Sequence, residues 1–208
     1  TREKSWRASN YVISPGVYGG DLLHGTASED KLQGVLGVWI TIPNLSPQMT
    51  HSIKSARKGH PAEDANITVT TDERERSVLV IGSGYGYTGL DPSSIDAEQL
   101  DLLYEATEDT ARFLFPKGYE AAVEDGSLLA SRRLCIRPWT ASGLGLFEVQ
   151  ETDDGGRCIV TGGHNTGGFT QSLSVAQAVR ATLLHRPHPM QELYHPNRLQ
   201  GFLRATRL

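Results

Sequence analysis

The sequence predicts an α+β fold with an antiparallel-rich sheet, because short β-branched and aromatic runs alternate with turn residues over most of the chain. These strand-like runs cover residues 11–14, 35–42, 67–71, 77–81, 133–136, 146–150 and 157–161. Two longer segments, 94–114 and 169–184, instead repeat apolar residues every three or four positions, as amphipathic helices do. We therefore expect strands to dominate the middle of the chain, with one helix after the central strands and one after the last strand.

The composition excludes several classes of protein. With 208 residues, of which 38% are apolar, the chain can bury a core and form one large domain or parts of two. The net charge of −4 leaves no basic stripe for a phosphate backbone, so nucleic acid is not an expected partner. No apolar run approaches the roughly 20 residues that a membrane span requires. We expect a soluble protein of the cytoplasm or the peroxisome rather than a secreted one.

The two cysteines do not predict a disulfide framework. Cys135 and Cys158 each lie in an apolar, strand-like run, where a buried free thiol is the usual state. The seven histidines are scattered and form no cluster at metal-ligand spacing. The sequence therefore predicts two inert thiols and no metal site.

The central segment predicts a hairpin followed by a helix. The charged residues 72–76 separate the runs at 67–71 and 77–81, which we expect to pair as a hairpin. Ser94 is a candidate N-cap for the helix that follows, and Asp96 and Glu98 would favour the positive end of its dipole. Pro116 is expected to end that helix.

A match to the dinucleotide-binding pattern G-x-G-x-x-G occurs at residues 84–89, directly after a predicted strand. The pattern binds a pyrophosphate only where it opens straight into a helix. Here Leu90-Asp91-Pro92-Ser93-Ser94 intervenes, and tyrosines occupy positions where close backbone approach is needed. We interpret these glycines as bending a strand, so the nucleotide-binding half is not expected within this chain.

The most informative segment is the glycine-rich loop at 162–168, between a buried strand and an amphipathic helix. Glycines allow positive φ angles and close approach of a ligand, and the N-terminus of the helix directs free N–H groups toward the loop. The spacing alone is equally consistent with an anion-binding loop and with a simple turn.

Residues 163–170, Gly-His-Asn-Thr-Gly-Gly-Phe-Thr, resemble the G-H-x-x-x-G-[FW]-T signature of the D-amino-acid-oxidase-type (DAO-type) FAD-dependent oxidoreductases. Residues 11–16 are similar to the family's strand that re-enters the FAD domain. The resemblance implies FAD as cofactor, held by the loop and the helix start. The residues so implied are Pro15, Gly16, Gly162, Gly163, His164, Asn165, Thr166, Gly167, Gly168, Phe169 and Thr170.

Residues 133–140 are similar to the family's G-x-R-P-x-T segment, although Cys135 and Ile136, and no glycine, directly precede the Arg-Pro pair. The resemblance implies that Arg137 is the catalytic-site arginine that pairs with a substrate carboxylate, a task for which a guanidinium fork is well shaped. A structural salt bridge is the alternative role for Arg137. Trp39, Tyr85 and Tyr87 are candidate substrate-pocket residues.

The resemblance extends over nearly the whole chain and implies its domain organisation. Residues 1–25 and 141–208 would belong to an FAD-binding, Rossmann-like domain, and residues 26–140 would form the substrate-binding domain. The dinucleotide-binding strand and helix would come from another chain with a GxGxxG unit. Two origins are possible for a heterodimer: proteolytic processing of one precursor, or two separately encoded subunits. We expect proteolytic processing, because the chain begins just upstream of a core strand of that domain.

The resemblance implies an oxidase that removes a hydride equivalent from a C–H next to nitrogen of an amino acid or amine. O2 would reoxidise the flavin and give hydrogen peroxide, and the imine would hydrolyse. Two alternatives remain open: a flavin-dependent dehydrogenase that passes electrons to a carrier, and a non-catalytic subunit that kept the fold.

Overall fold

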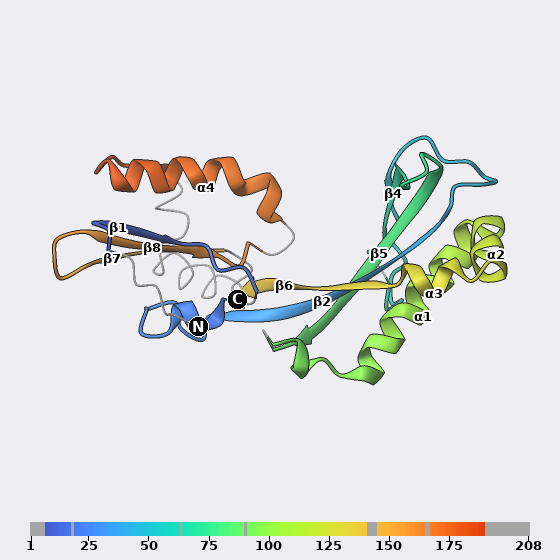
Figure 1. The fold of residues 1–208 in the computed structure, drawn as a ribbon, viewed down its shortest axis with the longest axis horizontal. Helices are drawn as coiled ribbons and strands as arrows, with labels where there is room; N and C mark the ends of the chain where they lie inside the picture. The colour runs from blue at the N-terminus through green and yellow to red at the C-terminus, as the bar shows by residue number, and fades with distance from the viewer. Residues whose placement is uncertain are drawn as a thin grey trace, which may run out of the picture. The chain divides into compact units, whose positions relative to one another are not determined.

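A computed structural model describes residues 7–17, 19–62, 64–89, 91–140, 145–164 and 167–189, without the side chains of residues 87, 88 and 92. The fold is α+β, as predicted, and is shown in Figure 1. The chain divides into two compact units: Thr1–Gly34 with Arg137–Leu208 form the first unit, and Val35–Ile136 form the second. These divisions lie at 34/35 and 136/137, whereas the sequence predicts domain boundaries at 25/26 and 140/141.

The second unit is built on a five-stranded sheet with the order β3-β4-β5-β2-β6. Its strands are β2 (Leu32–Pro43), β3 (Ile53–Lys54), β4 (Asn66–Thr71), β5 (Ser77–Thr88) and β6 (Arg133–Thr140), and β2 and β6 continue past the division into the first unit. The predicted hairpin is confirmed: β4 and β5 are antiparallel from the pair Thr71–Ser77 outward. The carboxylate of Asp72 accepts hydrogen bonds from the backbone N–H groups of Arg74 and Arg76 and closes the turn.

The G-x-G-x-x-G match lies mostly inside β5, which runs to Thr88, and the α1 helix (Ala97–Leu114) begins only after the short 3-10 turn η2 (Pro92–Ser94). A Cβ atom on Gly84 would lie 3.2 Å from the Leu103 side chain of α1, and one on Gly86 would lie 2.7 Å from Gln99. The glycines therefore let α1 pack closely on β5. This packing confirms that they do not form a dinucleotide-binding turn in this chain.

The helical part of the second unit differs from the prediction in two respects. Asp96, not Ser94, is the N-cap of α1, and its carboxylate accepts a hydrogen bond of 2.9 Å from the Glu98 N–H. Pro116 does end α1, but it also begins α2 (Pro116–Glu124), which α3 (Ser127–Ser131) follows. The sequence pattern missed α2 and α3 because each is too short to repeat an apolar stripe.

The first unit is built on a three-stranded sheet with the order β1-β8-β7. β1 (Asn10–Ile13) pairs in parallel with β8 (Arg157–Gly162), and β7 (Leu146–Glu151) pairs with β8 in antiparallel fashion. The α4 helix (Gly168–Leu183) covers one face of the sheet, where Ala178 packs with Phe147 and Ile159 (Figure 1).

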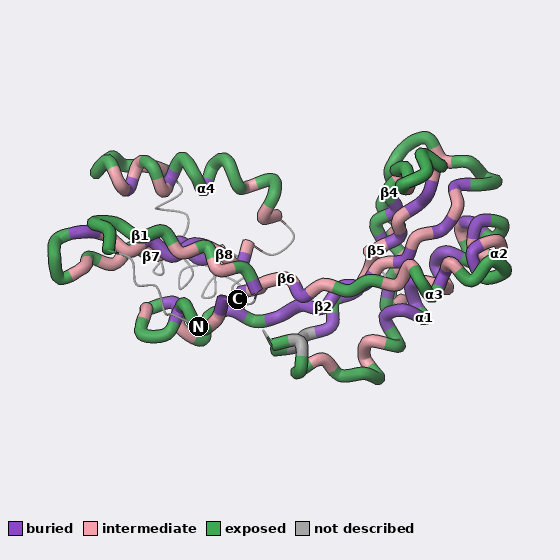
Figure 2. Tube along the Cα trace, viewed as in Figure 1, coloured by how far each residue is buried: buried purple, intermediate pink, exposed green. Residues whose placement is uncertain are grey.

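A segment before β2 forms a hydrogen bond and an ion pair with β7, one of the two outer strands of this sheet. It includes the 3-10 turn η1 (Gly20–Leu23), and the fully buried Ser28 hydroxyl donates a hydrogen bond of 2.7 Å to the Glu148 carboxylate of β7. Lys31 forms an ion pair with the same carboxylate. Most residues of β2 are buried, whereas half of the residues of α4 are exposed (Figure 2).

Cys135 and Cys158 are both free, as predicted, but each is half-buried rather than fully buried. Among the described residues no group of acidic, histidine or cysteine side chains could hold a metal ion. No described helix combines the length and the apolar character that crossing a bilayer demands.

Candidate functional site

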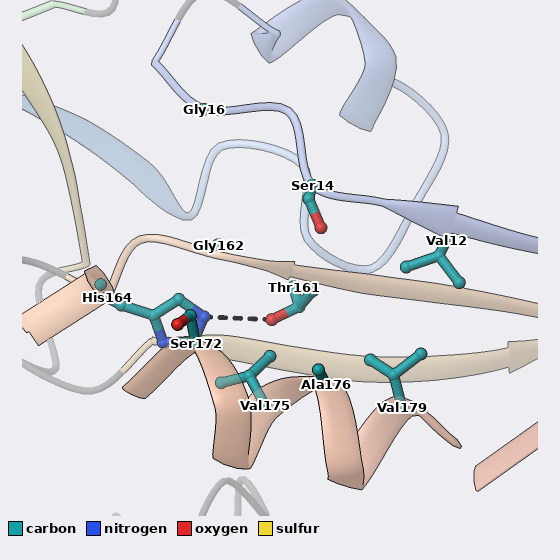
Figure 3. A pocket seen from close by; sticks show the side chains of 11 residues that line it. Val12, Ser14, Gly16, Thr161, Gly162, His164, Ser172, Val175, Ala176 and Val179 are labelled. Carbon is teal, nitrogen blue, oxygen red and sulfur yellow. Dashed lines mark hydrogen bonds between the residues drawn. The ribbon is translucent and has the colours of Figure 1, made fainter. Parts of the chain in front are cut away.

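A groove in the first unit lies between α4 and the ends of β1 and β8 (Figure 3). Its volume is about 410 Å³. The described residues that line it are Val12, Ser14, Gly16, Thr161, Gly162, His164, Gly168, Ser172, Val175, Ala176 and Val179. None of them is a Lys, Arg, Asp or Glu.

Strand alternation and helix periodicity place these side chains. In the parallel pair, Val12 lies beside Ile159, whose side chain packs under α4, so Val12 also faces the helix. Two residues later, Ser14 just after β1 and Thr161 on β8 also line the groove. The lining residues of α4 are 168, 172, 175, 176 and 179, a spacing that places them on one side of the helix.

The groove has two ends of different chemistry. Figure 3 shows Val12 and Val179 at one end, and Gly16 and His164 at the other. Gly16 has a φ angle of 63°, which favours glycine, and a Cβ atom there would meet nothing within 4 Å. A Cβ atom on Gly162 would lie 3.8 Å from Pro15, so the loop after β1 and the end of β8 lie close together. We call the part with Gly16, Gly162 and Gly168 the glycine end.

His164 is a fixed polar group at the glycine end. Its Nε2 atom lies 3.1 Å from the Thr161 hydroxyl, and it also interacts with Gln171 of α4. Burial lowers the pKa of His164, and the weaker effect of the Gln171 hydrogen bond raises it. The imidazole is therefore neutral at physiological pH. A Cβ atom on Gly145 would lie only 2.0 Å from its Nδ1 atom, so Gly145 leaves the space that the ring occupies.

Gly163 brings the end of β6 against the loop. Its φ angle is 63°, and a Cβ atom would lie 2.6 Å from Leu32 and 2.7 Å from the methyl group of Thr140. Next to it, His164 forms an isolated antiparallel bridge with Trp139. Arg137 lies two residues before Trp139 on the same strand and is half-buried. The structure thus brings the strand with Arg137 beside the glycine-rich loop.

The N-terminus of α4 lies at the glycine end of the groove. It has no side-chain cap and no acidic residue in its first turn, and Gly167 occupies its N-cap position. Its free N–H groups and the positive end of its dipole favour an anionic or electron-rich group. With a neutral histidine and no other titratable lining residue, the groove suits a ligand that is largely apolar with one electron-rich edge.

The structure brings together four of the predicted cofactor residues as lining groups: Gly16, Gly162, His164 and Gly168. Pro15, Gly163 and Gly167 do not line the groove. A Cβ atom on Gly167 would lie 2.4 Å from Gln171, so this glycine leaves the space that the Gln171 side chain occupies. Phe169 is 96% exposed and Thr170 is exposed, and neither lines the groove. Asn165 and Thr166 lie outside the described residues.

The predicted substrate-pocket residues lie on neighbouring strands of the five-stranded sheet. Trp39 is half-buried in β2, and Tyr85 of β5 is 43% exposed. Tyr85 lies between Gly84 and Gly86, which both face α1, so strand alternation points it to the other face of the sheet. The side chain of Tyr87 lies outside the described residues. A pocket shared by these residues with Arg137 stays a prediction.

Sequence reasoning missed the apolar wall of the groove, which consists of Val12, Val175, Ala176 and Val179. The alternation of residues 12 and 14 and the spacing of 172, 175, 176 and 179 were visible in the sequence. What was not visible was that β1 and β8 pair in parallel, because they are separated by more than 140 residues.

No family model matches the chain, and no curated protein matches it. Solved structures do. Glycine oxidase from Geobacillus kaustophilus is 18% identical with a TM-score of 0.56, and the match covers 86% of this chain and 42% of that one. For glycine oxidase from Bacillus cereus the identity is 15% and the TM-score 0.55, with coverage of 87% and 44%.

A third structure is fructosyl amine:oxygen oxidoreductase (amadoriase I) from Aspergillus fumigatus, with 14% identity, a TM-score of 0.56 and coverage of 84% and 39%. The chain spans about two fifths of the length of these structures. The resemblance noted in residues 163–170 is thus confirmed at the level of the fold: the chain has the fold of the corresponding part of DAO-type oxidoreductases such as glycine oxidase and amadoriase.

Proposed function

We propose that the chain forms part of an FAD-dependent oxidoreductase that oxidises a C–N bond of an amino acid or amine and passes the electrons to O2. One observation carries this proposal. The glycine-rich loop after β8, the N-terminus of α4 and Gly16 meet at one end of a groove without ionised side chains, in a fold shared with amine-oxidising enzymes.

The residues present fit a flavin in this groove. Gly16, Gly162 and Gly168 expose backbone at the glycine end, and the N–H groups of α4 point toward an electron-rich edge. His164 supplies a neutral polar contact whose ring is held by Thr161 and Gly145. When bound, FAD would supply the two-electron acceptor for the reaction.

The substrate would lose a hydride equivalent from the C–H next to nitrogen and a proton from the amine. The resulting imine is hydrolysed by water, and O2 takes up the two electrons and two protons as hydrogen peroxide. In this scheme Arg137 binds the substrate carboxylate through a bidentate ion pair. Its place on β6, two residues before the Trp139 that bridges to His164, supports that role.

The proposal requires a nucleotide-binding part, and within the described residues the G-x-G-x-x-G match is used instead in packing α1 on β5. We propose that this part belongs to a second chain in a heterodimer, derived from the same precursor by proteolysis. An intact mass of the native protein tests this directly: one mass that contains both parts contradicts the two-chain arrangement but leaves the flavin proposal standing.

The decisive experiment is an absorbance spectrum of the native protein purified from its source, followed by substrate reduction. Flavin bands that bleach with an amino acid or amine, with hydrogen peroxide formed on reoxidation, are expected. Bleaching without peroxide would favour the flavin-dependent dehydrogenase. A colourless protein would contradict the proposal and favour a non-catalytic subunit.

Arg137→Ala tests the substrate site. We expect a rise in KM of at least tenfold for carboxylate substrates and little change for amines without a carboxylate, since one lost charged pair corresponds to about 1.4 kcal/mol or more. Arg133→Ala is the matched control, because Arg133 lies on the same strand and is exposed. Equal kinetics for both variants toward every carboxylate substrate would exclude this role.

A further inference from the structure

The second unit has a groove of its own along the exposed side of α1, with a volume of about 430 Å³. Leu102, Ala106 and Asp109 line it from the helix, and His60 and Pro61 line it from the loop before β4. All its lining residues belong to the second unit, so it shares no residue with the groove of the first unit.

An apolar stripe follows α1 along this groove and continues beyond it. Leu102 is 59% exposed and Phe113 is 70% exposed, although both side chains are large and apolar. Positions 102, 106, 109 and 113 are four, three and four residues apart, so they share one side of the helix over about 16 Å. Ala106 is small, which allows a partner to approach closely. This is the spacing at which one amphipathic helix packs on another.

The loop beside the stripe is held on α1. The Arg57 Nη1 atom donates a hydrogen bond of 3.0 Å to the Asp109 carboxylate, and the guanidinium lies 5.3 Å from the centre of the Phe113 ring. The His60 Nδ1 atom accepts the Ala62 N–H at 3.0 Å, so its ring proton is on Nε2, which lies 3.3 Å from the same carboxylate. The groove is therefore preformed, and a partner need not order this loop when it binds.

The helix that carries the stripe is acidic. Its charged residues are Glu98, Asp101, Glu105, Glu108, Asp109 and Arg112, five acids against one base. Hydrogen bonds from Arg112 and Arg57 lower the pKa of Asp109, so its carboxylate is ionised at neutral pH. Glu105 is exposed and lines the groove. A complementary partner therefore has basic side chains next to an apolar stripe.

We propose that this groove, together with Phe113, binds a basic amphipathic helix of a partner protein. Apolar side chains of that helix pack on Leu102, Ala106 and Phe113, and its Lys or Arg side chains face Glu105. Burial of the exposed apolar side chains supplies affinity, while the charges orient the partner and speed its association. The inference goes beyond the proposed function and does not rest on it, because none of these residues is assigned to the flavin or the substrate.

Other occupants fit less well. A second copy offers no matching helix among the described residues, since α4 contains one basic residue, Arg180, and α2 contains one, Lys117. A small amine could fill the groove but would leave Phe113 uncovered, because that side chain lies outside the lining. Nucleic acids and anionic membranes would be repelled by the acidic helix.

The test measures binding of two labelled peptides to the full protein by fluorescence anisotropy. Each peptide has about 18 residues, or five helical turns, with Leu at spacings of four and three; one has Lys beside the Leu stripe and the other has Glu there. Leu102→Ser with Phe113→Ser removes the stripe, and Glu105→Lys reverses a charge at the groove. The matched controls are Leu129→Ser on α3 and Glu124→Lys on α2, exposed side chains outside the groove.

We expect the Lys peptide to bind about tenfold or more tightly than the Glu peptide. The double variant should lose affinity for the Lys peptide by about tenfold or more, Glu105→Lys by about threefold, and each control by less than about twofold. Because Leu102 and Phe113 are exposed, the double variant is expected to fold, and Glu105→Lys tests the same contact if it does not.

Equal affinities for the two peptides, no measurable binding, or equal losses in the control variants would overturn the inference. A dimer in sedimentation that dissociates in the double variant would also overturn it, because the occupant would then be a second copy. The flavin proposal is unaffected by either result, since flavin absorbance and substrate reduction test it separately.

Discussion

Single glycines determine how closely the loop after β8 packs on its surroundings. Gly163 combines a positive φ angle with a position where a Cβ atom would meet Leu32 and Thr140, so both backbone conformation and space require glycine. Gly155, in the turn between β7 and β8, has a φ angle of 79° but nothing within 4 Å of its Cβ direction. Substitution of Gly163 would therefore introduce both steric overlap and backbone strain, whereas substitution of Gly155 would introduce backbone strain alone.

Gly163→Ala should lower the free energy of unfolding by about 2–4 kcal/mol, because overpacking of 1–3 kcal/mol adds to backbone strain of about 1 kcal/mol. Gly155→Ala should lower it by about 1 kcal/mol, from strain alone. Urea denaturation of both variants measures the difference. Equal losses would mean that the contacts of Gly163 relax freely.

His164 predicts a pH dependence of stability. Burial lowers its pKa in the folded protein below the ordinary value near 6.5, so the unfolded chain binds the proton more readily. Stability should therefore rise with pH through the window between the lowered pKa and about 6.5, and fall as the pH drops through it.

His164→Gln should remove this contribution. We expect a flatter dependence of the urea midpoint on pH between about 5 and 7 than in the unchanged protein. The other histidines are the same in both proteins, so the difference between the two curves belongs to His164. Parallel curves would show that His164 is protonated as easily in the folded state as in the unfolded one.

At the scale of elements, the first turn of α1 shows where local sequence signals compete. Ser94, Asp96 and Glu98 all suit a helix start, and the sequence alone favoured Ser94. The structure uses Ser94 in the preceding 3-10 turn, where its hydroxyl donates to the Asp91 carbonyl at 2.6 Å. Asp96 then caps α1.

Asp96→Ala should cost about 1 kcal/mol of stability through loss of this cap. Ser94→Ala, the matched control, should cost less than about 0.5 kcal/mol because its hydrogen bond is exposed. Thermal unfolding of the two variants compares them. A larger loss for Ser94→Ala would mean that the helix begins earlier than the structure shows.

Most strands and both long helices could be predicted from the sequence, because alternation and three-to-four spacing are local signals. β4, β5 and α4 begin and end within about two residues of expectation at most of their ends. The exception is the C-terminal end of β5, which extends seven residues beyond the predicted end at residue 81. The prediction stopped there because the following residues are rich in glycine, which has a low propensity for strands. The two-residue β3 and the short α2 and α3 left no pattern to read.

The candidate site was predictable at its glycine end only. Glycines and His164 stand together in the sequence, whereas Val12, Thr161 and Val179 converge through a parallel pairing across most of the chain. Phe169 was expected near the cofactor, but its place on α4 turns it to the surface. Local motifs therefore located the loop, and tertiary pairing determined what lies opposite it.

At the scale of the whole molecule, the two units differ in how much core they hold. The large, fully buried apolar side chains of the described residues divide unevenly: Ile159 and Val160 belong to the first unit, and the second unit holds Val35, Leu36, Val38, Ile40, Ile42, Ile67, Leu79 and Ile81. Local opening is easier where fewer apolar contacts must be broken.

Native-state hydrogen exchange should therefore find the slowest amides in β2 and β5. The amides of β1 should exchange faster than those of β8, since β1 is an edge strand with an open face. Slowest exchange in β1 would contradict this ranking of the two units.

The second unit leaves and rejoins the rest of the chain through β2 and β6, which are neighbours in one sheet. Because the chain enters and leaves the second unit through adjacent strands, the residues between them can be lengthened, remodelled or exchanged without changing the path of the chain through the first unit. Variation between residues 35 and 136 is thus a route by which evolution, or a protein engineer, could change the second unit and leave the first unit as it is.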